Sequence, residues 1–275
     1  MNKHLALACL LLLPLPALAA PKCEFSKPVD MALDLAGVTK VMFEVNSHDL
    51  RLNAAPNAAG ALGGRACAST AELLNQLVVT QQKSGDTLRV ALRRESSGVK
   101  FQLGQFYTAI EVTGTVPDNV LVQLNVGSGD AVLDGAINAS ADVGSGDVAL
   151  SNIRGRATLA VGSGDISLTN IGALKVLSIG SGDVVGRDIR GAVEIGSIGS
   201  GDLTLVGIGG PVQLDSVGSG DATFRNVRGD VTVGSVGSGD ITVQNGQGNV
   251  SVARIGSGDL NTSGIKGAVS LPRKH

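Results

Sequence analysis

Apolar and polar residues alternate along the C-terminal half of the chain in short runs that recur at a nearly constant interval. Leu203 and Leu205 are apolar and flank a polar Thr, and the same alternation returns at Val212 and Leu214 before Val217 ends the unit. An alternation with period two is typical of a β-strand with one buried face. Each unit therefore predicts two short strands whose apolar side chains point into a shared core.

The tetrad Gly-Ser-Gly-Asp marks each unit and occurs eight times without a substitution. A constant interval of this size indicates a solenoid, in which each repeat buries its apolar face only against its neighbours. When each unit is numbered from its first Gly, positions 5, 7 and 10 are apolar in nearly every copy, and position 12 is usually Gly. The copies lie 17 to 19 residues apart and begin at Gly127, Gly144, Gly162, Gly180, Gly199, Gly218, Gly237 and Gly256.

These repeats predict an all-β fold, a single-stranded parallel β-helix or solenoid of about eight short coils. Two strands and two Gly-rich corners leave no room for a helix within 19 residues, which argues against a leucine-rich repeat despite Asn152, Asn170 and Asn226. Successive coils would stack about 4.8 Å apart, so eight coils make a rod about 40 Å long. Because the chain has no Trp, one Tyr and five Phe, we expect an aliphatic core of Val, Ile, Leu and Ala.

The N-terminal half shows no visible repeat between residues 22 and 115 and predicts mixed β structure with one short helix. Residues 38–45 and 49–52 alternate as half-buried strands do. Residues 54–66 are rich in Ala, Gly, Pro and Asn, a composition that predicts a surface loop.

A short helix and a hairpin complete this region. Ser69-Thr70-Ala71-Glu72 fits a capping box, in which the Ser hydroxyl and the Glu carboxylate satisfy backbone donors of a helix running to about Leu77. Residues 77–82 and 87–92 predict a hairpin joined through Lys83-Ser84-Gly85-Asp86. We expect the whole region to cap the solenoid, whose first coil would otherwise expose an unpaired edge.

The first residues have the features of a secretory signal peptide: Lys3 and His4, an apolar run over residues 5–13, and Ala17-Leu18-Ala19. The apolar run is too short to span a membrane as a helix. The sequence therefore predicts a signal peptide at 1–19, a cap region at 20–115 and a β-helix domain at 116–275.

Cleavage after Ala19 would remove Cys9 and leave Cys23 and Cys67. In an exported protein these two most simply form a disulfide, which closes a loop of about 45 residues and contributes about 3 to 4 kcal/mol. The alternative is a pair of free, buried thiols.

The tetrad unit, the lead-in Ile110-Glu111-Val112 with Pro117, and the strand at 120–126 together resemble a known family. The chain is similar from about Val38 to Leu271 to the bacterial "putative adhesin" proteins of unknown function with β-strand repeats. The resemblance implies an exported, right-handed β-helix, and it brings no catalytic residues with it.

The tetrad Asp residues are the feature most able to carry chemistry, because equivalent positions of a solenoid stack into a ladder. One interpretation is that each Asp accepts hydrogen bonds from the backbone N–H groups of its own turn. The alternative is a column of calcium ions, since calcium prefers carboxylate and carbonyl oxygens; otherwise no metal or cofactor is expected. The ladder consists of Asp130, Asp147, Asp165, Asp183, Asp202, Asp221, Asp240 and Asp259.

Other chemistry is poorly represented in the repeats. Ser128 and its seven equivalents have no neighbouring base in the sequence, and the three histidines (His4, His48 and His275) lie outside the repeats, which argues against a triad or a zinc site. A basic stripe at one corner is interpreted as a solvated edge that offsets the Asp ladder, and it consists of Arg154, Arg190, Arg228 and Lys266.

These observations predict a non-catalytic, adhesin-like or structural module of the cell envelope, in the periplasm or at the cell surface. Its partner would be an envelope or surface protein or a glycan. The 22 basic residues against 24 acidic ones give no electrostatic reason to expect nucleic acid. The alternative is an enzyme acting on polysaccharide, but the Asp ladder offers no unique carboxylate pair, and Phe224 is the only aromatic residue of the repeats.

Overall fold

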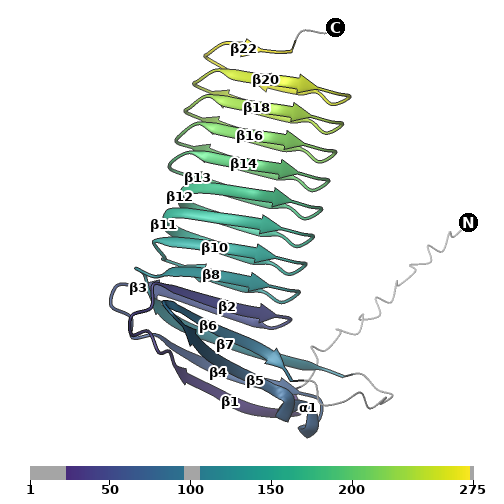
Figure 1. The fold of residues 1–275 in the computed structure, drawn as a ribbon. Helices are drawn as coiled ribbons and strands as arrows, with labels where there is room; N and C mark the ends of the chain where they lie inside the picture. Colours follow the sequence, from purple (N-terminus) through teal and green to yellow (C-terminus); the bar gives the residue numbers. More distant parts are fainter. Residues whose placement is uncertain (1–22, 96–105, 273–275) are drawn as a thin grey trace, which may run out of the picture.

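The computed structural model describes residues 23–95 and 106–272, which form one long stack of strands with a single short helix near its N-terminal end (Figure 1). The predicted signal peptide at 1–19 lies outside the described residues. The first elements are β1 (Phe25–Ala32), β2 (Lys40–Asn46), β3 (Asp49–Ala55), β4 (Ala61–Ala68), α1 (Ala71–Gln76), β5 (Leu77–Ser84), β6 (Thr87–Arg94) and β7 (Thr108–Pro117). The repeats form β8 (Leu121–Val126), β9 (Ala131–Asp134), β10 (Asn138–Val143), β11 (Val148–Val161), β12 (Ile166–Ile179), β13 (Val184–Ile189), β14 (Val193–Ile198), β15 (Leu203–Ile208), β16 (Val212–Val217), β17 (Ala222–Val227), β18 (Val231–Val236), β19 (Ile241–Gly246), β20 (Val250–Ile255), β21 (Leu260–Ser263) and β22 (Val269–Ser270).

Two parallel strand stacks face each other along the repeats. The first-strand sheet holds the strands that follow the tetrads: β9, β13, β15, β17, β19, β21 and the first halves of β11 and β12. The second-strand sheet holds β8, β10, β14, β16, β18, β20, β22 and the second halves of β11 and β12. The predicted parallel β-solenoid is therefore confirmed.

Equivalent repeat positions pair directly from coil to coil. At position 5, Val184 pairs with Leu203, which pairs with Ala222, which pairs with Ile241. This register keeps every apolar position on the inner face, since a slip by one residue would turn each of these side chains to solvent.

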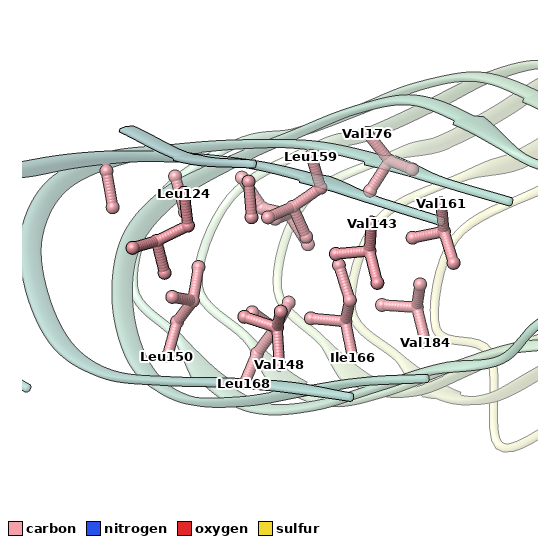
Figure 2. Close-up of a cluster of buried hydrophobic side chains, with 14 of the residues drawn as sticks. Leu124, Val143, Val148, Leu150, Leu159, Val161, Ile166, Leu168, Val176 and Val184 are labelled. Atoms are coloured by element: carbon pink, nitrogen blue, oxygen red, sulfur yellow. The ribbon is translucent and has the colours of Figure 1, made fainter. Parts of the chain in front are cut away.

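The core lies between the two sheets and is aliphatic, as the composition predicts (Figure 2). Leu150, Leu159 and Leu168 point into this space and are at most 1% exposed. Position 7 of one coil is Gly186, and the side chain of Leu205 in the next coil occupies the space where a Gly186 side chain would lie. A neighbouring coil thus fills the gap that the missing side chain would leave.

Position 9 of every repeat turns the chain out of the first strand with a left-handed backbone conformation. Gly, Asn and Asp are the residues that adopt this conformation at least cost. The position holds Gly135, Asn152, Asn170, Asp188, Gly207, Asn226, Asn245 and Gly264, all with φ between 56° and 91°. The Asn residues that superficially suggested a leucine-rich repeat are therefore turn residues.

The parallel stack extends below the predicted boundary at residue 116. β2 pairs in parallel with β8, and β3 pairs in parallel with β9, so these two strands form a further coil beneath the first tetrad. β6 and β7 pair in parallel with β2 and β3 and add another layer.

Antiparallel strands close this end of the stack. β5 pairs with β6, and β4 lies between β1 and β7, which covers the edge that would otherwise be open (Figure 1). The hairpin predicted through residues 83–86 is confirmed.

The prediction of a surface loop at 54–66 is wrong, because β3 continues to Ala55 and β4 begins at Ala61. Gly64 in this stretch serves close packing rather than a flexible connection. A Cβ on Gly64 would lie 2.1 Å from the carbonyl oxygen of Glu111 in β7. The missing side chain of Gly64 thus allows β7 to lie close against β4.

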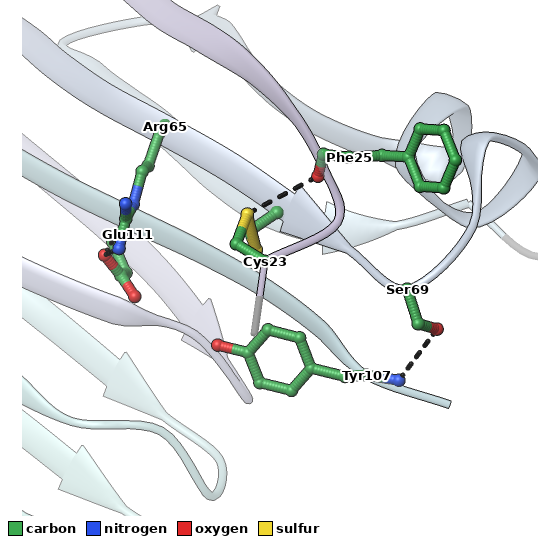
Figure 3. The surroundings of a disulfide bond; sticks show 7 residues. Cys23, Phe25, Arg65, Ser69, Tyr107 and Glu111 are labelled. Atoms are coloured by element: carbon green, nitrogen blue, oxygen red, sulfur yellow. Dashed lines mark hydrogen bonds and ion pairs between the residues drawn. A yellow bond between two sulfur atoms is a disulfide. The ribbon is translucent and has the colours of Figure 1, made fainter. Parts of the chain in front are cut away.

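The helix α1 begins one residue later than the predicted capping box. Thr70 is the N-cap, and its hydroxyl accepts a hydrogen bond from the N–H of Leu73. Ser69 instead accepts from the N–H of Tyr107 and ties the helix start to β7 (Figure 3). Because the cap is shifted, Glu72 lies one position too early to complete a capping box.

Cys23 and Cys67 form a disulfide, as the sequence predicted (Figure 3). Their Cα atoms lie 5.6 Å apart, within the usual range for such a bond. The bond attaches the chain before β1 to the buried Cys67 of β4 and so fastens the outermost strand to the cap.

Candidate functional site

The tetrad corner is built from backbone hydrogen bonds between successive coils. In coil after coil, the carbonyl of the first Gly accepts two N–H groups from the coil above: Gly180 accepts from Ser200 at 2.8 Å and from Gly201 at 3.1 Å. This arrangement leaves the N–H of the following Asp without a backbone acceptor in the coil below.

The Asp side chain supplies that acceptor. Oδ1 of Asp183 accepts the N–H of Asp202 at 2.9 Å, and Oδ1 of Asp202 accepts the N–H of Asp221 at 2.9 Å. Each carboxylate therefore serves the coil above it. This corrects the expectation that each Asp serves its own turn, and the cause is that stacking, rather than the local turn, leaves an unpaired donor. The same bond joins Asp130–Asp147, Asp147–Asp165, Asp165–Asp183, Asp221–Asp240 and Asp240–Asp259.

The Gly at tetrad position 3 allows this close stacking. A Cβ on Gly201 would lie 1.9 Å from the carbonyl oxygen of Gly182. Ser200 beside it is exposed, as is the carboxylate of Asp202. The outer surface of the corner therefore presents alternating hydroxyls and carboxylates on a closely packed backbone.

A divergent tetrad lies beneath the eight intact ones. The backbone carbonyl of Asn46 accepts the N–H groups of Ser128 and Gly129. Oδ1 of Asp49 accepts the N–H of Asp130 at 3.4 Å. This coil is not evident from the sequence, because only Ser and Asp remain of the tetrad in Asn46-Ser47-His48-Asp49. Burial raises the pKa of Asp49, while the N–H of Asp130 partly offsets that effect.

Within residues 23–95 and 106–272, no group of three or more His, Cys, Asp and Glu side chains is arranged to hold a metal ion. Along the corner, one oxygen of each Asp through Asp240 is already engaged by a backbone donor. The expectation that the ladder works without calcium stays a prediction, and it can be tested directly.

We expect Asp202→Asn to keep the free energy of unfolding within about 0.5 kcal/mol of wild type or to raise it. The amide Oδ1 still accepts from Asp221, and one of a row of like charges is removed. Asp202→Ala removes the acceptor and should cost about 1 kcal/mol. Urea denaturation of the three proteins checks this, and an equal loss in both variants would show that the charge itself stabilises the corner.

We also expect millimolar calcium, followed by excess chelator, to leave the melting temperature unchanged within about two degrees. A calcium column would behave differently, because a ligand bound only by the folded state raises stability with its concentration. A rise of about ten degrees that disappears on chelation and in Asp183→Asn/Asp202→Asn would contradict our assignment.

His48 occupies position 3 of the divergent tetrad, where the intact tetrads have Gly. It is 2% exposed, and its Nδ1 accepts the N–H of Ile110 at 3.3 Å. Burial lowers the pKa of His48 below its usual value of 6.5. The ring is therefore held neutral as a structural acceptor in the cap.

This burial predicts a pH dependence of stability. The unfolded chain takes up a proton near pH 6.5, which the folded His48 resists, so stability is complete above that pH and falls as the pH drops below it. His48→Asn keeps an acceptor but does not titrate. We expect its free energy of unfolding to change less than that of wild type between about pH 7.5 and 5.5, and equal changes in urea titrations would exclude His48 as the source.

The predicted basic stripe lies at the corner opposite the tetrads, but its four members differ. Arg154 contacts Asp118 and donates to the carbonyl of Gly135 at 3.2 Å. Arg190 donates to Asn170 and to the carbonyl of Arg154, the latter at 3.2 Å. These two side chains donate to backbone carbonyls of earlier coils. Arg190 also lines an open cavity, together with Arg228 and Lys266.

Comparison with known proteins finds a matching family. The family model described as Toastrack DUF4097 matches residues 38–225, and no curated protein matches the chain. None of the helices in the described part of the chain is long and apolar enough to cross a membrane.

A search of solved structures finds chains that are similar to this one at low sequence identity. A "putative lipid binding protein" from Parabacteroides distasonis is 17% identical, with 90% of this chain and 97% of that chain covered and a TM-score of 0.45. A "putative adhesin" from Parabacteroides merdae is 12% identical, with 91% and 97% covered and a TM-score of 0.35. A "putative cell adhesion protein" from Clostridium sporogenes is 13% identical, with 91% and 100% covered and a TM-score of 0.32.

The family model covers more than half of the sequence, from the divergent coil through the sixth tetrad. The chain therefore belongs to the Toastrack DUF4097 family.

Proposed function

We propose that the protein is exported to the cell envelope, where its solenoid acts as a non-catalytic interaction module, adhesin-like or structural. The observation that carries this proposal is the uninterrupted parallel stack, which repeats the same corner in every coil and so offers many equivalent contacts along one rod. Extended, repetitive surfaces of solenoids suit binding to extended partners.

Two further features support export, and a third supports binding over catalysis. The Cys23–Cys67 disulfide is typical of proteins that fold outside the cytoplasm, and the first 19 residues have the pattern of a signal peptide. The tetrad carboxylates are equivalent and engage the backbone, which leaves this corner without a unique acid and base pair for glycoside hydrolysis.

Expression of the full sequence with a C-terminal tag tests the proposal in two steps. Cell fractionation should place the protein outside the cytoplasm, with Ala20 as its first residue and no free thiol at Cys23 or Cys67. The purified protein should then retain an envelope component without releasing reducing ends from envelope polysaccharide. A cytoplasmic protein with two reactive thiols would refute export, and new reducing ends would show that it is an enzyme.

A further inference from the structure

The corner opposite the tetrads contains an open cavity of about 630 Å³. Its lining includes Gly207 and Gly209, two positions without a side chain in one coil, and Arg190 in the coil before and Arg228 in the coil after. The cavity continues along the rod to Lys266. We call it the basic corner groove.

Its three cations occur at position 11 of every second coil. Because coils stack about 4.8 Å apart, Arg190, Arg228 and Lys266 follow one another at intervals of about 10 Å. Gly209 and Gln247 occupy the same position in the coils between them. Within the described residues, Arg228 and Lys266 are exposed, and their side chains make neither an ion pair nor a hydrogen bond. Two cations are therefore available to a ligand.

Amide side chains lie among these cations. Asn226, Asn245 and Gln247 all line the groove, and Nδ2 of Asn245 donates to Oδ1 of Asn226 at 3.2 Å. The pair still has the amide donor of Asn226 and the carbonyl acceptor of Asn245 available. Groups of this kind hydrogen-bond to hydroxyls in either direction.

We propose that the basic corner groove binds a linear acidic polysaccharide whose carboxylates contact Arg228 and Lys266 and whose hydroxyls contact the amides. Guanidinium and ammonium groups bind carboxylates with charge-assisted hydrogen bonds. The wide interval between the cations fits a polymer with widely spaced charges. This inference specifies the ligand of the interaction module proposed above and rests on that function.

Nucleic acid fits the groove less well. Its phosphates follow one another far more closely than every 10 Å or so, and single strands are normally held by aromatic side chains that stack on the bases. None of the residues lining the groove is aromatic. Asp188 at its first end would in addition repel a densely charged polyanion.

Isothermal titration of the purified protein with hyaluronate oligosaccharides, which carry a carboxylate on every second sugar, at about 50 mM and about 300 mM NaCl tests the proposal. We expect binding at low salt, weaker binding at high salt, and no binding of neutral dextran. Arg228→Gln/Lys266→Gln should lower the affinity at least about tenfold and weaken its dependence on salt. Arg65→Gln/Arg93→Gln removes the same charge from exposed positions of the cap and should change nothing.

A gain of affinity provides the complementary test. Gln247→Arg places a cation between Arg228 and Lys266, and we expect it to tighten hyaluronate binding several-fold at low salt. Equal affinity for oligothymidylate would make the groove a general polyanion site and overturn the assignment to polysaccharide. No binding of hyaluronate, or equal losses in the groove and cap variants, would also overturn it. These outcomes use purified protein and leave the test of export unaffected.

Discussion

Replacing Gly201 by Ala should lower the free energy of unfolding by about 3 kcal/mol or more. The added methyl would lie 1.9 Å from the carbonyl oxygen of Gly182 and 2.9 Å from the carbonyl carbon of the same residue. Both are backbone atoms of the coil below, so the two coils must separate. That separation would lengthen the hydrogen bonds that Gly180 accepts from Ser200 and Gly201.

Two control variants distinguish this clash from a general effect of alanine. Ser200→Ala changes the neighbouring exposed residue of the same tetrad, and Gly63→Ala adds a methyl that meets no atom within 4 Å. Both should stay within about 0.5 kcal/mol of wild type. Urea denaturation checks all three variants, and a Gly201→Ala protein as stable as the controls would mean that the coils are not packed this closely at the corner.

The repeat pattern predicts the strands of each coil but not the hydrogen bonds of the tetrad Asp. The alternation at Leu203 and Leu205, and its return at Val212 and Leu214, was sufficient to predict two strands per coil and the inward face of each. The hydrogen bond made by Asp202 was not predictable from its own turn. Its carboxylate accepts the N–H of Asp221, which lies 19 residues later in the chain. Such a contact depends on the stacking register, which local sequence does not specify.

Composition misled the prediction in the cap. Residues 54–66 have the Ala and Gly content of a loop, yet most of this stretch continues β3 or forms β4, where Gly64 allows close approach to Glu111. The divergent coil could have been found from a Ser and an Asp two residues apart, followed by the apolar alternation of Leu50 and Leu52. Two tetrad residues and one strand pattern are a weaker signal than eight intact copies.

The sequence predicted which basic residues share the opposite corner, but not which of them are available to a ligand. Arg190, Arg228 and Lys266 could be grouped from the repeat numbering alone, because they share position 11. That Arg190 is engaged by earlier carbonyls while Arg228 and Lys266 line an open cavity depends on side-chain directions. Periodicity thus predicts which residues share an edge, and the packing of each coil decides which of them are available to a ligand.

The buried column at position 7 should be the most sensitive place for a charge. Leu205 is fully buried between the two sheets and fills the space beside Gly186. Leu205→Asp would put a carboxylate there without a hydrogen-bond donor or a cation, and we expect a loss of about 4 kcal/mol or more in the free energy of unfolding. Leu205→Val, which only removes volume, should cost about 1 to 2 kcal/mol.

The matched control for this charge is Thr204→Asp, one residue earlier on β15. Thr204 is half-buried on the outer face of the sheet and lies beside Val185 and Thr223 of the neighbouring coils. A carboxylate at this position remains hydrated, so we expect a loss of about 1 kcal/mol or less, mainly from the lower strand preference of Asp. Thermal and urea unfolding of the two Asp variants give the comparison, and similar losses in both would contradict the inward orientation of Leu205, on which the core of the solenoid depends.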